Sequence, residues 1–165
     1  MPHKGFTLIE ILIVIVIISI VSGIAALTLS RNQQKQYESL ANRLAHVITL
    51  AEEEAMLRPA TLGLAFKPDG FQFFEYHPKT NHNKIPWHPL TDPIFGLHRI
   101  AQNTEITLFI QNKKVDLSGQ PQIIISMSGD IAPFIILIGK KEQLPLYQVI
   151  GYANGTVVSR IWHEK

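Results

Sequence analysis

The stretch Lys4-Gly5-Phe6-Thr7-Leu8-Ile9-Glu10, followed by an uncharged run over residues 11–30, decides how this chain is built. When helical, an apolar run of about 20 residues matches the hydrocarbon thickness of a bilayer. The sequence therefore predicts that residues 6–30 form the transmembrane half of a longer helix. Because the chain has no proline from Phe6 to Leu57, the same helix is expected to continue to about residue 58.

Glu10 is the unusual residue of this segment, because it places a carboxylate inside an apolar helix. Such a charge costs on the order of a few kcal/mol unless it is paired. Cleavage after Gly5 would make Phe6 the new N-terminus, and its α-amine could neutralise Glu10 of a neighbouring subunit. A glycine before the cut suits a protease that needs close access to the backbone.

These residues resemble the class III signal of type IV pilins and type II secretion pseudopilins. The resemblance implies that a prepilin peptidase removes the leader, residues 1–5, by cutting between Gly5 and Phe6, and then methylates the Phe6 amine. It also implies a role for Glu10 in subunit assembly. The expected location is the bacterial inner membrane, crossed once, with the C-terminal domain in the periplasm.

Two other interpretations of the N-terminus are a secretory signal peptide cleaved near Gly23-Ile24-Ala25 and an ordinary signal anchor. Glu10 inside the apolar segment argues against the first. The second explains the length of the segment but not the Gly-Phe-Thr-Leu sequence before the acid. Basic side chains lie on both sides of the apolar run, so the orientation rests on the resemblance.

Amino-acid composition limits the classes of protein to which this chain can belong. About 135 residues follow the apolar run, which is enough for one modest domain and too few for a two-domain enzyme. A formal net charge of +2 gives no sign of general polyanion binding. The chain has no cysteine, which excludes disulfides and cysteine-ligated zinc. We expect no cofactor, because no nucleotide-binding or metalloprotease motif is present.

Residues 31–58 are predicted to form the amphipathic half of the helix. Apolar residues recur at helical spacing from Leu40 to Ala55 and predict one buried stripe. Glu52, Glu53 and Glu54 point in different directions on a helix and are interpreted as a solvated helix end. The helix should stop at Arg58, since a residue before proline avoids helical geometry.

Residues 59–165 are predicted to form a β-rich periplasmic domain. Strands 61–66 and 71–76 flank Lys67-Pro68-Asp69-Gly70, a turn in which Gly70 is expected to take a positive φ. Further strands are expected at 106–110, 122–127, 133–138, 147–152 and 156–161, as an antiparallel meander with a tight turn at Asn154-Gly155. The predicted fold class is α+β: a long N-terminal helix packed on an antiparallel sheet, as in pilins.

Residues 77–98 are predicted to form a long loop. His77, His82, His88 and His98 lie in it or at its edge, but their spacing matches no standard metal-ligand pattern. We therefore expect no metal site, and we expect Trp87 and Phe95 to pin the loop to the domain or to contact a partner subunit.

Ser128, Gly129 and Asp130 could suggest a hydrolytic centre. Their composition is that of a turn, however, and no nucleophile elbow surrounds the serine. We expect no catalytic residues and no enzymatic activity.

Residues 121–134, with 71–74 and 87–90, are similar to the soluble domain of the H-type minor pseudopilins of type II secretion. This resemblance implies a structural subunit of the pseudopilus, at or near its tip, that drives folded exoproteins through the outer-membrane secretin. Its expected partners are the prepilin peptidase, other major and minor pseudopilins and the inner membrane, with the secretin or exoproteins as further candidates.

The alternative is a minor type IV pilin of the FimT or FimU kind, which serves pilus assembly or DNA uptake. A pilin that takes up DNA is expected to present a basic, aromatic-lined patch on its surface. The candidates for such a patch are two short turn-borne pairs, Lys113-Lys114 and Lys140-Lys141. Their usual role is hairpin solubility, so no nucleic acid partner is expected.

Overall fold

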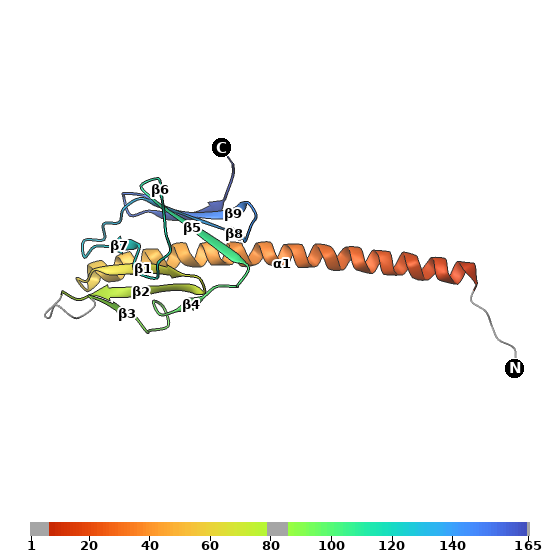
Figure 1. The fold of residues 1–165 in the computed structure, drawn as a ribbon, viewed down its shortest axis with the longest axis horizontal. Helices are drawn as coiled ribbons and strands as arrows, with labels where there is room; N and C mark the ends of the chain where they lie inside the picture. The colour runs from red at the N-terminus through yellow and green to blue at the C-terminus, as the bar shows by residue number, and fades with distance from the viewer. Residues whose placement is uncertain (1–6, 79–85, 165) are drawn as a thin grey trace. The chain divides into compact units, whose positions relative to one another are not determined.

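The computed structural model describes residues 7–78 and 86–164. The chain divides into two compact units, Met1–Gln36 and Tyr37–Lys165. Helix α1 runs from Leu8 to Leu57 and contributes to both units, whereas the strands of the described residues belong to the second (Figure 1).

The end of α1 lies where the sequence predicts it. The Arg58 amide still donates to the Glu54 carbonyl at 3.0 Å, and the Ala60 amide donates to the Ala55 carbonyl at 3.3 Å. Pro59 has no amide hydrogen and disfavours helical geometry at the residue before it. The helix therefore ends in a turn that leads directly into the first strand.

Within the second unit, α1 buries the predicted apolar stripe. Leu44, Ile48, Ala51 and Ala55 are completely buried. The stripe also includes residues that the sequence analysis left out: Tyr37, Ala41 and Ala45. Tyr37 extends it by about one turn toward the N-terminus, and the two alanines fall within the predicted range.

Among the described residues, the first sheet consists of β1 (Leu62–Lys67), β2 (Gly70–Tyr76), β3 (Trp87–Pro89), β4 (His98–Arg99) and β7 (Ile123–Ile125). Their order is β3-β2-β1-β7, and β4 also pairs with β2. All pairings are antiparallel.

The second sheet has the order β10-β9-β8-β5-β6 and is also antiparallel. Its strands are β5 (Thr104–Ile110), β6 (Lys113–Val115), β8 (Phe134–Lys140), β9 (Pro145–Gly151) and β10 (Val157–Ile161). The predicted α+β fold class is confirmed. The prediction of a single meander is wrong, because β7, which was expected in this sheet, pairs with β1 of the first sheet.

One hydrophobic core joins both sheets to the helix. It contains Phe66, Phe71 and Phe73 from the first sheet and Ile136 and Ile138 from the second, together with the stripe of α1. Figure 1 shows the C-terminal part of α1 alongside the strands of the domain. Full burial of a large apolar side chain contributes about 1.5–3 kcal/mol, so the predicted stripe stabilises the domain substantially.

The hairpin β1–β2 is confirmed, but the reason for Gly70 differs from the prediction. Positive φ values occur at Gly119, Gly129 and Gly155 among the described glycines, and Gly70 is not one of them. A Cβ at Gly70 would instead lie 2.2 Å from the carbonyl oxygen of His98. Glycine is needed there because the backbone of β4 comes so close.

The segment predicted as a long loop contains the short strands β3 and β4, and both pair with β2. Residues 79–85, including His82, lie outside the described residues. Trp87 packs edge-on against Tyr76 with ring centroids 5.2 Å apart, and Phe95 packs against Phe73 at 5.4 Å. These contacts confirm that the two aromatic residues pin the segment to the domain.

Candidate functional site

The predicted processing residues Gly5 and Phe6 lie outside the described residues, but the start of the helix next to them is described. The Thr7 carbonyl accepts hydrogen bonds from the amides of Glu10 and Ile11, at 3.1 and 3.3 Å. The Thr7 hydroxyl also accepts from the Glu10 amide at 3.3 Å. Thr7 is therefore the N-cap of α1, and Glu10 lies in its first turn.

This position gives Glu10 a local role that the sequence analysis missed. Thr7 and Glu10 have the spacing of a capping box, and a carboxylate in the first turn interacts favourably with the positive end of the helix dipole. The signal was present in the Thr-x-x-Glu pattern. Among the described residues Glu10 forms no ion pair.

The first turns of α1 present apolar side chains without cover from the rest of the unit. Those from Leu8 to Val21 are all exposed, with Leu8 at 86%. Ser19 satisfies its hydroxyl by donating to the Ile15 carbonyl at 2.8 Å. Within the described ranges, no helical stretch combines the length and apolar character that crossing a bilayer requires.

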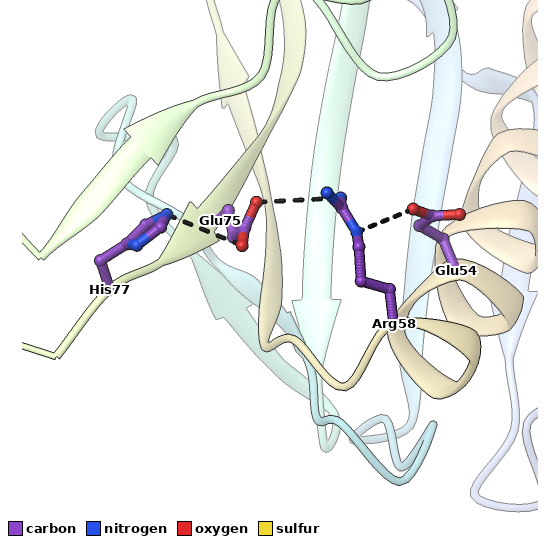
Figure 2. Close-up of polar contacts among 4 residues, drawn as sticks. All are labelled: Glu54, Arg58, Glu75 and His77. Carbon is purple, nitrogen blue, oxygen red and sulfur yellow. Dashed lines mark ion pairs between the residues drawn. The ribbon is translucent and has the colours of Figure 1, made fainter.

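At the other end of α1, a chain of polar contacts connects the helix to β2 (Figure 2). Arg58 Nε lies 3.1 Å from Glu54 Oε1, and Arg58 Nη2 lies 3.8 Å from Glu75 Oε2. His77 Nε2 lies 3.6 Å from the other oxygen of Glu75. Since Arg58 and His77 are largely exposed, these pairs orient the helix end and contribute little stability.

The histidines of the 77–98 segment do not gather at one point. His77 and His88 lie edge to face with ring centroids 4.9 Å apart, whereas His98 is buried and stacks on Phe71. In the described part of the chain, no three potential metal ligands are grouped so that they could hold an ion.

His98 instead forms a polar contact between α1 and the first sheet, in which its own ring is buried and Arg43 is exposed. Its Nε2 lies 2.7 Å from the Ile94 carbonyl, which can only accept, so Nε2 carries the proton. Nδ1 is therefore the acceptor for the Arg43 guanidinium, with which it forms a short hydrogen bond. No local sequence pattern predicts this pairing, because the two residues are 55 positions apart.

The interpretation of Glu52, Glu53 and Glu54 as a solvated end is wrong for Glu52. Its side chain is only 5% exposed, while Glu53 is exposed and Glu54 pairs with Arg58. Burial and, to a lesser degree, the neighbouring charge of Glu53 raise the pKa of Glu52 from 4.5 to about 7. The signal was its position four residues after Ile48, on the apolar stripe.

Ser128, Gly129 and Asp130 form the predicted turn. The Ser128 hydroxyl donates to Asp130 and lies 2.7 Å from the Ser126 hydroxyl, and Gly129 has a φ of 82°. The polar groups of the turn thus satisfy one another, as in a surface turn.

The two lysine pairs lie at opposite ends of β5. Lys113 pairs with Ile110 at its C-terminal end, and Lys140 pairs with Thr104 at its N-terminal end. At about 3.3 Å per residue, a seven-residue strand separates them by roughly 20 Å. They do not form one basic patch.

Sequence comparison identifies similar proteins. The family described as the prokaryotic N-terminal methylation motif matches residues 1–26. The type II secretion system protein H of Pseudomonas aeruginosa is 30% identical over 151 residues, which cover 84% of each chain. The protein of the same name from Escherichia coli K12 is 26% identical over 138 residues, covering 82% of this chain and 80% of that protein.

Two solved structures share the fold. The crystal structure of the minor pseudopilin EpsH from the type II secretion system of Vibrio cholerae matches with a TM-score of 0.67 at 18% identity, covering 80% of this chain and 98% of that one. The solution structure of Escherichia coli GspH matches with a TM-score of 0.59 at 22% identity, covering 78% and 89%.

Proposed function

Because the chain belongs to the type II secretion system protein H family, we propose that it works as a minor pseudopilin, a structural subunit of the periplasmic pseudopilus at or near its tip. In this role it helps to drive folded exoproteins through the outer-membrane secretin. The observation that carries the proposal is the 30% identity over 84% of both chains. The N-terminal methylation motif supports it independently.

The proposed topology places residues 6–30 in the inner membrane and residues 59–165 in the periplasm, with residues 31–58 as the amphipathic link. The uncharged run over residues 11–30 supports this arrangement, as do the exposed apolar side chains from Leu8 to Val21. A helix whose apolar side chains all face outward needs an apolar environment such as lipid or neighbouring helices.

Processing prepares the subunit for assembly. In the proposed sequence, the prepilin peptidase cuts between Gly5 and Phe6 and methylates the new Phe6 amine. The Thr7 cap keeps the helix start in place one residue after the new terminus. Glu10 then takes the amine of a neighbouring major or minor pseudopilin as its counter-charge, which ties the removal of the leader to incorporation into the filament.

The work of this protein is therefore assembly, not catalysis. The groups that suggested chemistry have structural roles: Ser128 and Asp130 satisfy a turn, and His98 holds α1 against the first sheet. The separation of the lysine pairs removes the feature that would have favoured a DNA-uptake pilin of the FimT or FimU kind.

The test is deletion of the gene in its native host, with measurement of exoproteins in the culture medium and the periplasm. We expect exoproteins to accumulate in the periplasm and to reach the medium again when the wild-type gene is restored. Mass spectrometry of the restored protein should show loss of Met1 to Gly5 and the addition of one methyl group.

Unchanged exoprotein release after deletion, with pilus-dependent DNA uptake lost instead, would contradict the proposed function. An intact leader, or cleavage near Ala25, would contradict the processing step alone.

A further inference from the structure

A hollow of about 460 Å³ lies between α1 and two turns of the domain. Its helix side is formed by Thr49, Glu52, Glu53 and Met56, and its other walls are residues 128–130 and 153–155. Three of the lining side chains are acidic, namely Glu52, Glu53 and Asp130, and none is basic. The hollow is therefore a negatively charged cavity on the domain.

Glu52 distinguishes this cavity from an ordinary group of surface acids. The residue is 95% buried, and its Oε1 atom, shielded from solvent, has no hydrogen-bond partner among the described residues. Natural proteins rarely leave a buried carboxylate oxygen without a partner, and each such group calls for an explanation. Neither the turn at 128–130 nor the turn at 153–155 supplies a donor to it.

The arrangement also indicates what kind of group is missing. In the described ranges, no three potential metal ligands come close enough to hold an ion, which argues against a metal. A long cationic side chain can enter from outside and bring several donors to carboxylates that are spread along a wall. Arginine in particular is suited to partly buried ion pairs, because its guanidinium is weakly hydrated and has five donors.

We propose that this cavity receives a cationic side chain, arginine or lysine, of a neighbouring pseudopilin, and that Glu52 is its principal counter-charge. This inference rests on the proposed function, because it takes the partner from the filament. The incoming cation supplies the counter-charge that Glu52 lacks in the separate subunit.

The contact is expected to depend on pH. The raised pKa of Glu52 means that a large share of the carboxyl is protonated and neutral near pH 7 in the separate subunit. The other titratable groups of the cavity, Glu53 and Asp130, are exposed. A cation binds the ionised form, so the contact should be stronger at pH 8 than at pH 6.

The experiment uses the full chain in its native host with all other pseudopilins present. A photo-crosslinking amino acid replaces Ala153, an exposed residue on the rim, and adducts are mapped by mass spectrometry. We expect an adduct to another pseudopilin, attached within a few residues of an arginine or lysine. The same probe at Lys141, near the opposite end of the second sheet, serves as the positional control.

Glu52→Gln should reduce the Ala153 adduct by about tenfold or more, since it removes one partner of a buried charge pair. The matched control is Glu38→Gln, an exposed glutamate of the same helix that lies outside the cavity. It should leave the adduct unchanged. Subunit abundance is measured in parallel, because a loss of folded protein would lower every adduct, including that at Lys141.

An adduct that survives Glu52→Gln, that maps far from any basic residue, or that disappears when divalent metals are chelated would overturn the inference. The proposed function is tested separately by gene deletion. If deletion stops secretion but Glu52→Gln changes neither the adduct nor secretion, the cavity assignment fails and the function stands.

Discussion

Arg43 on α1 donates to Nδ1 of the buried His98 and so joins the helix to β4, which begins at this histidine. The other ring nitrogen is occupied by the Ile94 carbonyl, so the neutral imidazole uses both of its polar atoms. Loss of the Arg43 side chain would remove the hydrogen-bond partner of Nδ1.

We therefore expect Arg43→Ala to lower the free energy of unfolding by about 1–3 kcal/mol. Urea denaturation of the full chain in detergent micelles, followed by tryptophan fluorescence, measures the change. Arg99→Ala is the matched control, because Arg99 is exposed on β4 and should change stability by less than about 0.5 kcal/mol. Equal changes in the free energy of unfolding for the two substitutions would show that the contact with His98 does not stabilise the fold.

Glu52→Gln should stabilise the separate subunit, and the gain should grow with pH. The pKa of Glu52 is near 7 in the folded chain and near 4.5 when unfolded, so its stabilising contribution is complete below pH 4.5 and is lost as the pH rises through 7. Glutamine remains neutral throughout. We expect no difference at pH 4 and a gain of roughly 1–3 kcal/mol at pH 8, from urea denaturation at both pH values. A gain that is independent of pH would contradict this explanation.

Gly70→Ala should be strongly destabilising, because the new methyl group would lie 2.2 Å from the His98 carbonyl oxygen. We expect a loss of about 1–3 kcal/mol, the usual effect of overpacking. Gly155→Asn is the control: Gly155 has a positive φ but open space around it, and asparagine tolerates that conformation. Thermal unfolding of both variants distinguishes steric contact from backbone conformation.

Glu10→Ala should preserve membrane insertion and impair assembly, because it removes a charge that needs a partner from another subunit. Membrane fractionation and crosslinking to other pseudopilins in the native host measure the two effects. Thr7→Ala is the informative comparison, since it removes the N-cap at a cost of about 1 kcal/mol and keeps the carboxylate. If both variants assemble equally poorly, the role of Glu10 lies in the helix start and not between subunits.

The sequence predicted the features that depend on local patterns. The buried stripe around Leu44 and Ile48, the end of α1 before Pro59, and the hairpins at Pro68-Asp69 and Asn154-Gly155 all follow from spacing or from turn chemistry. The contacts of Trp87 and Phe95 were expected because large aromatic side chains seldom remain without cover.

Features that depend on distant partners were missed. The contact of Arg43 with His98, the pairing of β7 with β1 and the closeness of β4 to Gly70 each join segments that no local pattern connects. Glu52 is a different case, because its position on the apolar stripe was visible. It was assigned to solvent because charged residues are rarely buried without a partner.

The pairing of β7 with β1 has a consequence for the order of folding. Leu62 pairs with Ile125, yet β5 and β6 of the second sheet lie between them in the chain. During synthesis, β1 therefore cannot pair with β7 until β5 and β6 have been synthesised, and the edge of β1 stays unpaired until then. Closing so long a loop is slow, whereas the β8–β9 and β9–β10 hairpins close locally. The open edge of β1 is thus the surface most exposed to mispairing before the chain is complete.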